Sequence, residues 1–359
     1  MKNRERIIKT LQCEETDRPP LPAWLGFSPW QQTVERWCEE SGIDDLDIRK
    51  YFAFDRFFEI VLVECGPLPH FEEKLIEETD EFVTAIDWRG ITTRNRRDRL
   101  SMPDFIAHPI HSPEEWKLYK DERLQLHLDE RLTCLDSFLK KIEGQDVPVQ
   151  VGKLPWGVFG TPRDLLGAEE LLISFYSQPD LVRDIMETMT TLWLAVYEGI
   201  SKRVQIDCIH IWEDMSFNKG SLISMDMVES FMMPQYDRIT EFAKAKGIPI
   251  VSVDTDGLVD ELVPTMMKHG INAFFPFEVQ AGNNVEEYRE KYPKLGILGG
   301  LDKRALARDK VCMHRELDRA ENMLAKGGYI PGFDHLIPPD VPWNNYKYFV
   351  EQLKVMVGI

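Results

Sequence analysis

The chain has 359 residues, with 43 Lys and Arg against 61 Asp and Glu, which gives a formal net charge of −18. This acidic balance argues against nucleic acid and anionic membranes as main partners, because both attract a positively charged face. The residues are 43% hydrophobic and 11% aromatic, enough to bury a large core, so a disordered protein is excluded.

The cysteines and the first residues of the chain indicate the compartment. No two cysteines form a C-x-x-C pair, so neither a disulfide framework nor a zinc ribbon is predicted. Residues 1–20 are charged and lack the apolar run of a signal peptide. No apolar run reaches the roughly 18 residues that a membrane span needs. We therefore expect a cytoplasmic protein without a membrane partner.

Short apolar runs rich in Val, Ile and Phe are typical of strands that are buried on both faces. In chain order these runs cover residues 19–27, 57–64, 147–151, 208–212, 248–253, 271–277, 295–300 and 328–333. Amphipathic helical patterns separate the later runs, notably over 179–200, 224–247 and 257–270. Pro234 and Pro264 fall inside two of these helical patterns and are expected to kink or split them.

Alternating strands and helices predict a parallel sheet with covering helices, hence an α/β fold. No G-x-G-x-x-G follows any predicted strand, which disfavours a dinucleotide-binding sheet. Eight strand segments favour a TIM (β/α)8 barrel, formed by residues 1–359 as a single domain with an N-terminal helical segment. Residues 70–115 are highly charged around a strand–turn–strand pattern at Trp88 and predict a β-hairpin insertion at the barrel rim, a candidate lid.

In such a barrel the reacting side chains lie at the C-terminal ends of the strands. Asp254 and Asp256 follow one predicted strand, where they could bind a metal or share a proton. Asp256 could equally cap the helix that follows. His335, after the last strand, could act as an acid, a base or a metal ligand, or make only structural hydrogen bonds.

Further carboxylates and aromatic residues complete the candidate site. Glu213 and Glu278 end strands on either side of Asp254, where they could orient a substrate or only bind backbone amides. Trp24, Lys153 and Trp156 are candidate substrate-binding residues, although the two tryptophans could instead belong to the core. His210 lies within its strand and is interpreted as a hydrogen-bonded core residue.

Several segments resemble the uroporphyrinogen decarboxylase superfamily, which includes cobalamin-dependent methyltransferases. The similar segments are NRERIIKTLQCEETDRPPLPAW, VGKLPWGVFGTPRDLLG, WEDMSFNKGSLISMDMVESFMMPQYDRI, VDTDG, GGLDKRALA and GGYIPGFDHLIPPDVPWNNYKYFVEQLK. They cover nearly the whole chain outside residues 70–115. The resemblance implies a TIM barrel, in agreement with the eight predicted strands.

The chain departs from both branches of that superfamily. LGFSPWQQT replaces the decarboxylases' arginine-containing stretch after the first strand, although the matching histidine, His335, is present. Glu213 falls where those decarboxylases have a serine, and their tyrosine has no clear counterpart near Thr161. The methyltransferases' zinc-binding H-x-C reads Asp254-Thr255-Asp256 here, and their final cysteine position reads His335. Asp254, Asp256 and His335 thus form a candidate oxygen and imidazole site for a divalent metal such as Zn.

The resemblance favours a methyltransferase that moves a methyl group between a small methoxylated or methylamine-type compound and cobalamin on a corrinoid-binding partner protein. Asp254, Asp256, His335 and Glu213 are its candidate catalytic residues. Trp24, Lys153, Trp156 and Glu278 are expected to bind the substrate, and a homodimer is one expected assembly. The alternatives are a decarboxylase-like lyase acting on a smaller carboxylic acid and a non-catalytic ligand-binding barrel.

Overall fold

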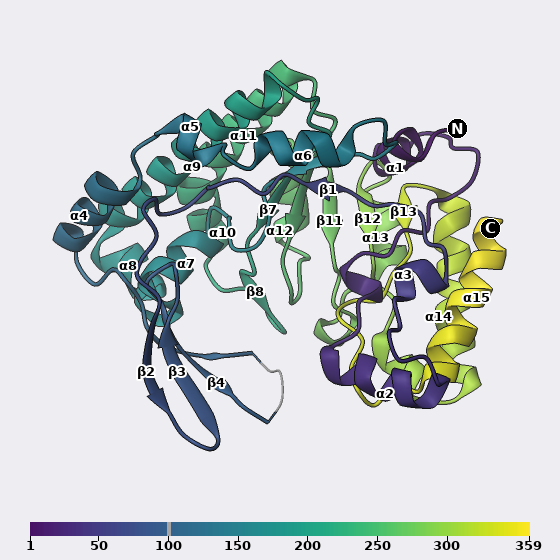
Figure 1. Ribbon diagram of the computed structural model, residues 1–359. Helices are drawn as coiled ribbons and strands as arrows, with labels where there is room; N and C mark the ends of the chain where they lie inside the picture. Colours follow the sequence, from purple (N-terminus) through teal and green to yellow (C-terminus); the bar gives the residue numbers. More distant parts are fainter. Residues whose placement is uncertain (99–101) are drawn as a thin grey trace.

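The computed structural model describes residues 1–98 and 102–359. It has an α/β fold in which a curled parallel sheet is surrounded by helices (Figure 1). The sheet order β1-β6-β7-β10-β11-β12-β13 follows the chain, as helical crossovers between parallel strands require. The strands are β1 Glu59–Ile60, β6 Val149–Val151, β7 Cys208–Trp212, β10 Ile250–Asp254, β11 Ala273–Phe275, β12 Gly296–Leu298 and β13 Tyr329–Ile330. Seven of the eight predicted strand segments therefore contain a strand.

The predicted strand over residues 19–27 is wrong. In this segment Pro22 makes a single parallel bridge to Asp55, and Leu25–Phe27 forms a turn of 3-10 helix. Three of its first four residues are prolines, which have no backbone N–H to donate to a strand ladder. The segment consequently runs beside the sheet without forming a regular strand in it.

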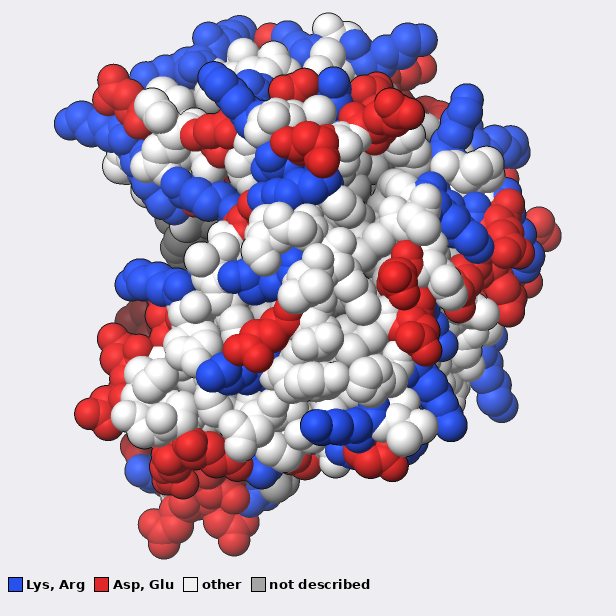
Figure 2. Space-filling model, turned by 90° about the vertical axis from the view of Figure 1, so that its right-hand side faces the viewer, with Lys and Arg blue, Asp and Glu red and all other residues white. Residues whose placement is uncertain are grey.

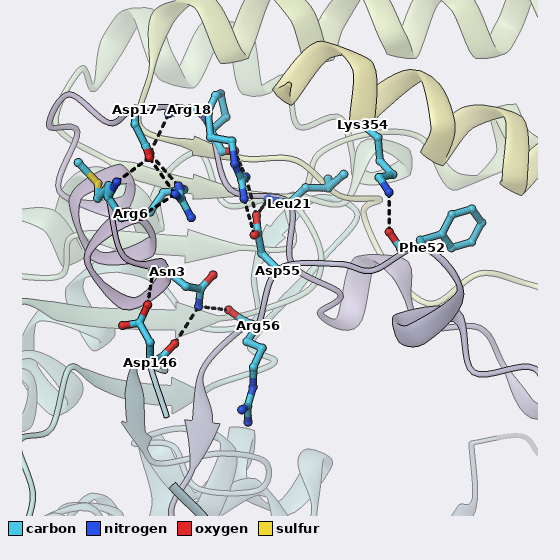
Figure 3. A network of polar contacts seen from close by, with 12 residues as sticks. Asn3, Arg6, Asp17, Arg18, Leu21, Phe52, Asp55, Arg56, Asp146 and Lys354 are labelled. Carbon is cyan, nitrogen blue, oxygen red and sulfur yellow. Dashed lines mark hydrogen bonds and ion pairs between the residues drawn. The ribbon is translucent and has the colours of Figure 1, made fainter. Parts of the chain in front are cut away.

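The same segment nevertheless connects the two edges of the curled sheet. The amide of Phe333, beyond β13, donates to the carbonyl of Gly26 at 3.0 Å, and the amide of Asp55, before β1, donates to the carbonyl of Leu21 at 3.0 Å. Arg18 donates two hydrogen bonds of 2.7 and 2.6 Å to the Asp55 carboxylate, which also accepts from the Leu21 amide (Figure 3). Sheet and segment therefore enclose a common interior.

The helical patterns form helices, and the two internal prolines act differently. The pattern over 179–200 is α9, Pro179–Ser201. The pattern over 224–247 is divided into α10 Met225–Met227, a π-helical stretch Val228–Met232 and α11 Met233–Lys246, with Pro234 in the first turn of α11. α12 is Leu262–Lys268 and begins two residues before Pro264, within the first turn, where proline is tolerated.

The remaining helices complete the outer layer and bring the ends of the chain together. Trp37 in α2 packs on Tyr346 in α15 with a centroid distance of 4.3 Å. The bounds are α1 Asn3–Leu11, α2 Gln31–Ser41, α3 Ile48–Tyr51, α4 Pro113–Arg123, α5 Leu128–Arg131, α6 Leu135–Ile142, α7 Gly160–Leu166, α8 Ala168–Ser177, α13 Val285–Lys291, α14 Lys310–Lys326 and α15 Trp343–Val357.

Residues 74–107 contain a second, antiparallel sheet in the order β2-β3-β4-β5, where a hairpin was expected. Its strands are β2 Lys74–Glu78, β3 Phe82–Ile86, β4 Thr92–Arg96 and β5 Asp104–Ala107, and residues 99–101 of the predicted insertion lie outside the described residues. In Figure 1 this sheet projects from the end of the molecule toward which β8, Ser216–Phe217, also extends. Arg89, between β3 and β4, forms an ion pair with Asp164 of α7. The role of this antiparallel sheet as a lid stays a prediction.

The surface charges are mixed on the face shown in Figure 2, which is the right-hand side of Figure 1. Lys and Arg side chains alternate there with Asp and Glu side chains. The described residues form no continuous basic area on that face of the kind that nucleic-acid binding requires. No helix in the described part of the chain is both long and apolar enough to cross a membrane.

Candidate active site

A cavity of about 770 Å³ lies within the curled sheet. Its volume falls within the roughly 300–1,000 Å³ of small-molecule sites. Asp254, the last residue of β10, lines it, and Lys153, just after β6, lines it on the other side of β7. The other lining residues within the strands are Glu59, Ile60, Gln150, Cys208, His210, Ile250, Ser252, Phe275 and Leu298. The cavity thus runs inside the sheet from the first residues of strands, such as Cys208 and Ile250, to Asp254 at the C-terminal end of β10, where the sequence predicts the chemistry.

Aromatic rings form one wall of this cavity. The ring of Trp24 lies 6.4 Å from that of Phe57 and 5.6 Å from that of Phe275, measured between centroids. Phe275 in turn stacks on His210 at 5.0 Å and 14°. The Trp24 indole donates to the carbonyl of Pro331 at 3.1 Å, which fixes the ring. This row of rings offers a planar apolar ligand a surface to pack against.

His210 is buried and hydrogen-bonded, as the sequence indicated, and it also lines this cavity. Its Nδ1 lies 3.0 Å from the hydroxyl of Ser252, which is the residue paired with His210 on the neighbouring strand β10. Its Nε2 lies 3.8 Å from Oδ2 of Asp254, longer than a hydrogen bond. The matched register of His210 and Ser252 comes from strand pairing, which the sequence alone does not reveal.

Asp254 and Asp256 form the acidic part of the site. Burial raises the pKa of Asp254. Burial, the Asp254 charge and the charges of Asp214 and Glu278 raise the pKa of Asp256 to about 8. The Asp256 side chain is 38% exposed and lies outside the cavity lining, two residues beyond Asp254. At neutral pH this pair therefore holds a proton that it can donate.

His335 lies beside this pair, with its Nε2 3.7 Å from Oδ2 of Asp256. Burial and the positive charge of Lys303 lower the pKa of His335, so its imidazole is neutral near pH 7. The loop that carries it is fixed by buried Asp334, which accepts from the amides of Val279 and Lys303 at 2.9 and 3.2 Å. Lys303 was not predicted from the sequence, because it lies several residues beyond the end of β12 and only the fold brings it near His335.

The three predicted metal ligands do not form a metal centre in this arrangement. Within residues 1–98 and 102–359 no group of three or more His, Cys, Asp or Glu side chains is placed to hold a metal ion. The positive charge of Lys303, which acts on both Asp256 and His335, also opposes a cation between them. The described residues therefore show no assembled metal site, and the divalent metal stays a prediction.

Glu213 was expected to be catalytic, but the structure gives it a structural role. It is completely buried, and its oxygens accept from the amides of Val158, Phe159 and Gly160 at 2.9, 2.6 and 3.0 Å. The Tyr236 hydroxyl donates a fourth hydrogen bond at 2.6 Å. Burial raises the pKa of Glu213, and these donors counteract the rise. Glu213 thus anchors the beginning of α7 and has no oxygen left for a substrate.

The predicted substrate-binding residues are divided between the cavity and other places. Trp24 and Lys153 line the cavity. Trp156 is instead buried against Trp88 of the insertion, at 6.1 Å and 71°. Glu278 lies outside the cavity lining and accepts from the Gly257 amide at 3.1 Å, and its charge acts on Asp256.

Comparison with known proteins agrees with this architecture. The family model described as uroporphyrinogen decarboxylase (URO-D) matches residues 95–355, more than half of the chain. A solved structure, "methyltransferase from Methanosarcina mazei", is 16% identical, with 98% of each chain covered and a TM-score of 0.62. At that identity the likeness shows a shared fold. No curated protein sequence matches. The chain belongs to the uroporphyrinogen decarboxylase family.

Proposed function

We propose that this protein is a methyltransferase that moves a methyl group from a small methylated donor to cobalamin carried by a partner protein. The observation that supports it most is a pair of neighbouring carboxyls with raised pKa values, Asp254 and Asp256, of which Asp254 lines a cavity walled by aromatic rings. The shared fold of the Methanosarcina mazei methyltransferase supports the same assignment. We take residues 19–27 as the irregular eighth position of a (β/α)8 barrel.

The residues of the chain supply binding and proton transfer. A donor ring would pack against Trp24 and Phe275, which places its methoxyl group toward Asp254. As the bond between oxygen and methyl carbon breaks, the electron pair stays on oxygen, and the Asp254/Asp256 pair donates the proton that neutralises it. Neutral His335 beside Asp256 can accept or return that proton.

Cobalamin would supply the nucleophilic cobalt that accepts the methyl group. A corrinoid is larger than the drug-sized ligands that sites of about this volume hold, so the cavity suits the donor and leaves the cofactor outside. The partner would therefore present its corrinoid from outside the cavity, beside the partly exposed Asp256. For the transfer to occur, the methyl group of the donor in the cavity and the cobalt of the corrinoid outside it must be able to reach each other.

The second candidate is a lyase that decarboxylates a small acid. The retained His335 and the raised pKa of Asp256 favour it, because a carbanion left by loss of CO2 must be protonated. One assay separates the two activities. The protein is mixed anaerobically with reduced cobalamin on a carrier protein and with two panels, one of methoxylated and methylamine compounds and one of small carboxylic acids. Methyl transfer to cobalt supports the proposal, whereas CO2 release without transfer supports the lyase.

A further inference from the structure

The loops that carry Asp256 and His335 are joined through a third loop, residues 276–284, which follows β11. Asp256 lies just after β10, the direct neighbour of β11 in the sheet, whereas His335 lies after β13, two strands beyond β11. The third loop is tied to the His335 loop by a backbone amide that donates to the carboxylate of Asp334 at 2.9 Å. Its connection to the turn after Asp256 runs through the buried side chain of Asn283.

Asn283 uses the full hydrogen-bonding capacity of its side chain. Its Nδ2 donates to the carbonyls of Gly257 and Glu278, both at 2.8 Å. Its Oδ1 accepts from the Val259 amide at 3.2 Å and from the Tyr288 hydroxyl at 3.0 Å. An asparagine amide has two N–H donors and two acceptor lone pairs, so every one of them is used here. Because the two carbonyls can only accept, these contacts also define which way the amide points.

The turn that Asn283 contacts is also held from its other side. Gly257 has φ +81, and a side chain there would come within 2.7 Å of the backbone of β8, Ser216–Phe217. The next amide, that of Leu258, donates to the carbonyl of the second β8 residue at 2.9 Å. The turn is therefore enclosed between β8 and the loop after β11, and a displacement of that loop would displace the turn after Asp256 with it.

We propose, building on the methyltransferase function above, that Asn283 is a positioning residue for Asp256. Its hydrogen bonds join the turn after β10 to the loop after β11, and Asp334 joins the same loop to His335. The 3.7 Å distance between Asp256 and His335 therefore depends on the loop that Asn283 fixes. A buried polar network in which every group is satisfied is rigid, and proton transfer requires groups held within hydrogen-bond reach. Asn283 lies outside the cavity lining, so it acts through Asp256 and not on the donor.

Hydrogen–deuterium exchange tests this inference without a methyl donor or cobalamin. Asn283→Asp and Asn283→Leu keep the approximate size of the side chain and remove its N–H donors to the carbonyls of Gly257 and Glu278. The measured quantity is the exchange rate of the Gly257 amide, which donates to the Glu278 carboxylate at 3.1 Å. We expect this amide to exchange roughly tenfold faster or more in both variants than in the wild type, because the turn opens more often.

The two variants protect the test against misfolding and against the added charge. Asn283→Asp keeps the acceptor oxygens for Val259 and Tyr288, so it still decides the question if Asn283→Leu does not fold. An unchanged exchange rate in the folded variants would overturn the positioning role, whether or not methyl transfer is observed. Faster exchange in Asn283→Asp but not in a folded Asn283→Leu would assign the effect to the new charge and would also overturn it.

Asn272 provides a matched control at the opposite end of β10. Its Nδ2 donates to the carbonyl of Pro249 at 2.8 Å, and its Oδ1 accepts from the Val251 amide at 2.9 Å. Asn272→Asp therefore removes the same kind of bridge away from the site, and we expect the exchange rate of the Gly257 amide to stay within about twofold of the wild type. Equal acceleration in Asn272→Asp and Asn283→Asp would indicate a general loss of stability and contradict the positioning role.

The methyl-transfer assay adds a kinetic readout. Asn283→Asp should lower kcat roughly tenfold or more and leave KM within about twofold, because Asn283 orients an acid and does not contact the donor. Asn272→Asp should leave both constants within about twofold of the wild type. A raised KM with an unchanged kcat in Asn283→Asp would contradict the positioning role. Because the exchange measurement does not use the reaction, a wild type without methyl transfer would count against the proposed function alone.

Discussion

The imidazole of His335 lies 3.7 Å from the carboxyl of Asp256, and burial shifts the pKa values of these two groups in opposite directions. Asp256 keeps its proton at a pH where an ordinary carboxyl group has lost it, while His335 stays neutral. An acid and a potential base thus lie side by side near Asp254, which lines the cavity. Neighbouring titratable groups whose surroundings shift their pKa values in opposite directions are typical of acid–base catalysis.

The first prediction concerns the pH dependence of the reaction. Because Asp256 donates a proton and its pKa is about 8, kcat/KM should fall as the pH rises through about 8. Asp256→Asn should lower kcat by roughly 100-fold or more and remove this alkaline limb. Glu278→Gln removes one of the charges that raise the pKa of Asp256 and should move the limb to lower pH. If the alkaline limb stays at the same pH in Glu278→Gln, the limb reports the titration of a group other than Asp256.

The same carboxyl should affect stability. A pKa raised in the folded state means that the folded protein binds this proton more tightly than the unfolded chain does. The resulting stabilisation is fully present below the unfolded pKa of about 3.9 and is lost as the pH rises through about 8. Asp256→Asn should therefore gain Tm relative to the wild type between pH 5 and pH 9. If the Tm of the two proteins changes with pH in the same way over this range, the pKa of Asp256 is not raised in the folded protein.

Glu213 should prove essential for folding and not for chemistry. Glu213→Gln keeps the size of the side chain but turns an amide group toward backbone donors, so about 2–4 kcal/mol of unfolding free energy should be lost. Tyr236→Phe removes one of the four donors and should cost about 1–3 kcal/mol. Denaturant unfolding measures both losses. A stable Glu213→Gln protein without activity would restore the catalytic role that the sequence indicated.

Gly152 offers a test of the contact between β6 and β7. Gly152→Ala combines a positive φ with overlap against the His210 carbonyl and should cost about 3 kcal/mol or more. Gly144 is a matched control, because its φ is +69 and a side chain there meets nothing within 4 Å. Gly144→Ala should cost only about 1–2 kcal/mol, the penalty of the left-handed backbone. Equal losses in the two variants would show that the close approach is not important.

The strands could be predicted because buried parallel strands have continuous apolar sequences, as in the 208–212 run that forms β7. The segment over 19–27 has similar hydrophobicity, but its prolines cannot pair. Predicting the site was harder. The strand-end rule selected Asp254, which lines the cavity, but also selected Glu213, whose backbone partners at the start of α7 come from the tertiary fold. His210 is buried and hydrogen-bonded as expected, but only strand register identifies its partner as Ser252.

The most direct test of the account follows an isotopically labelled methyl group. The protein is given a methoxylated aromatic compound labelled in its methoxyl carbon, together with reduced cobalamin on a carrier protein, and the cobalt-bound methyl group is identified by mass spectrometry. We expect the label to appear on cobalt, the demethylated phenol to be released, and Asp256→Asn to slow both events roughly 100-fold. Label that remains in the donor across a panel of methoxylated compounds would contradict the proposed methyl transfer.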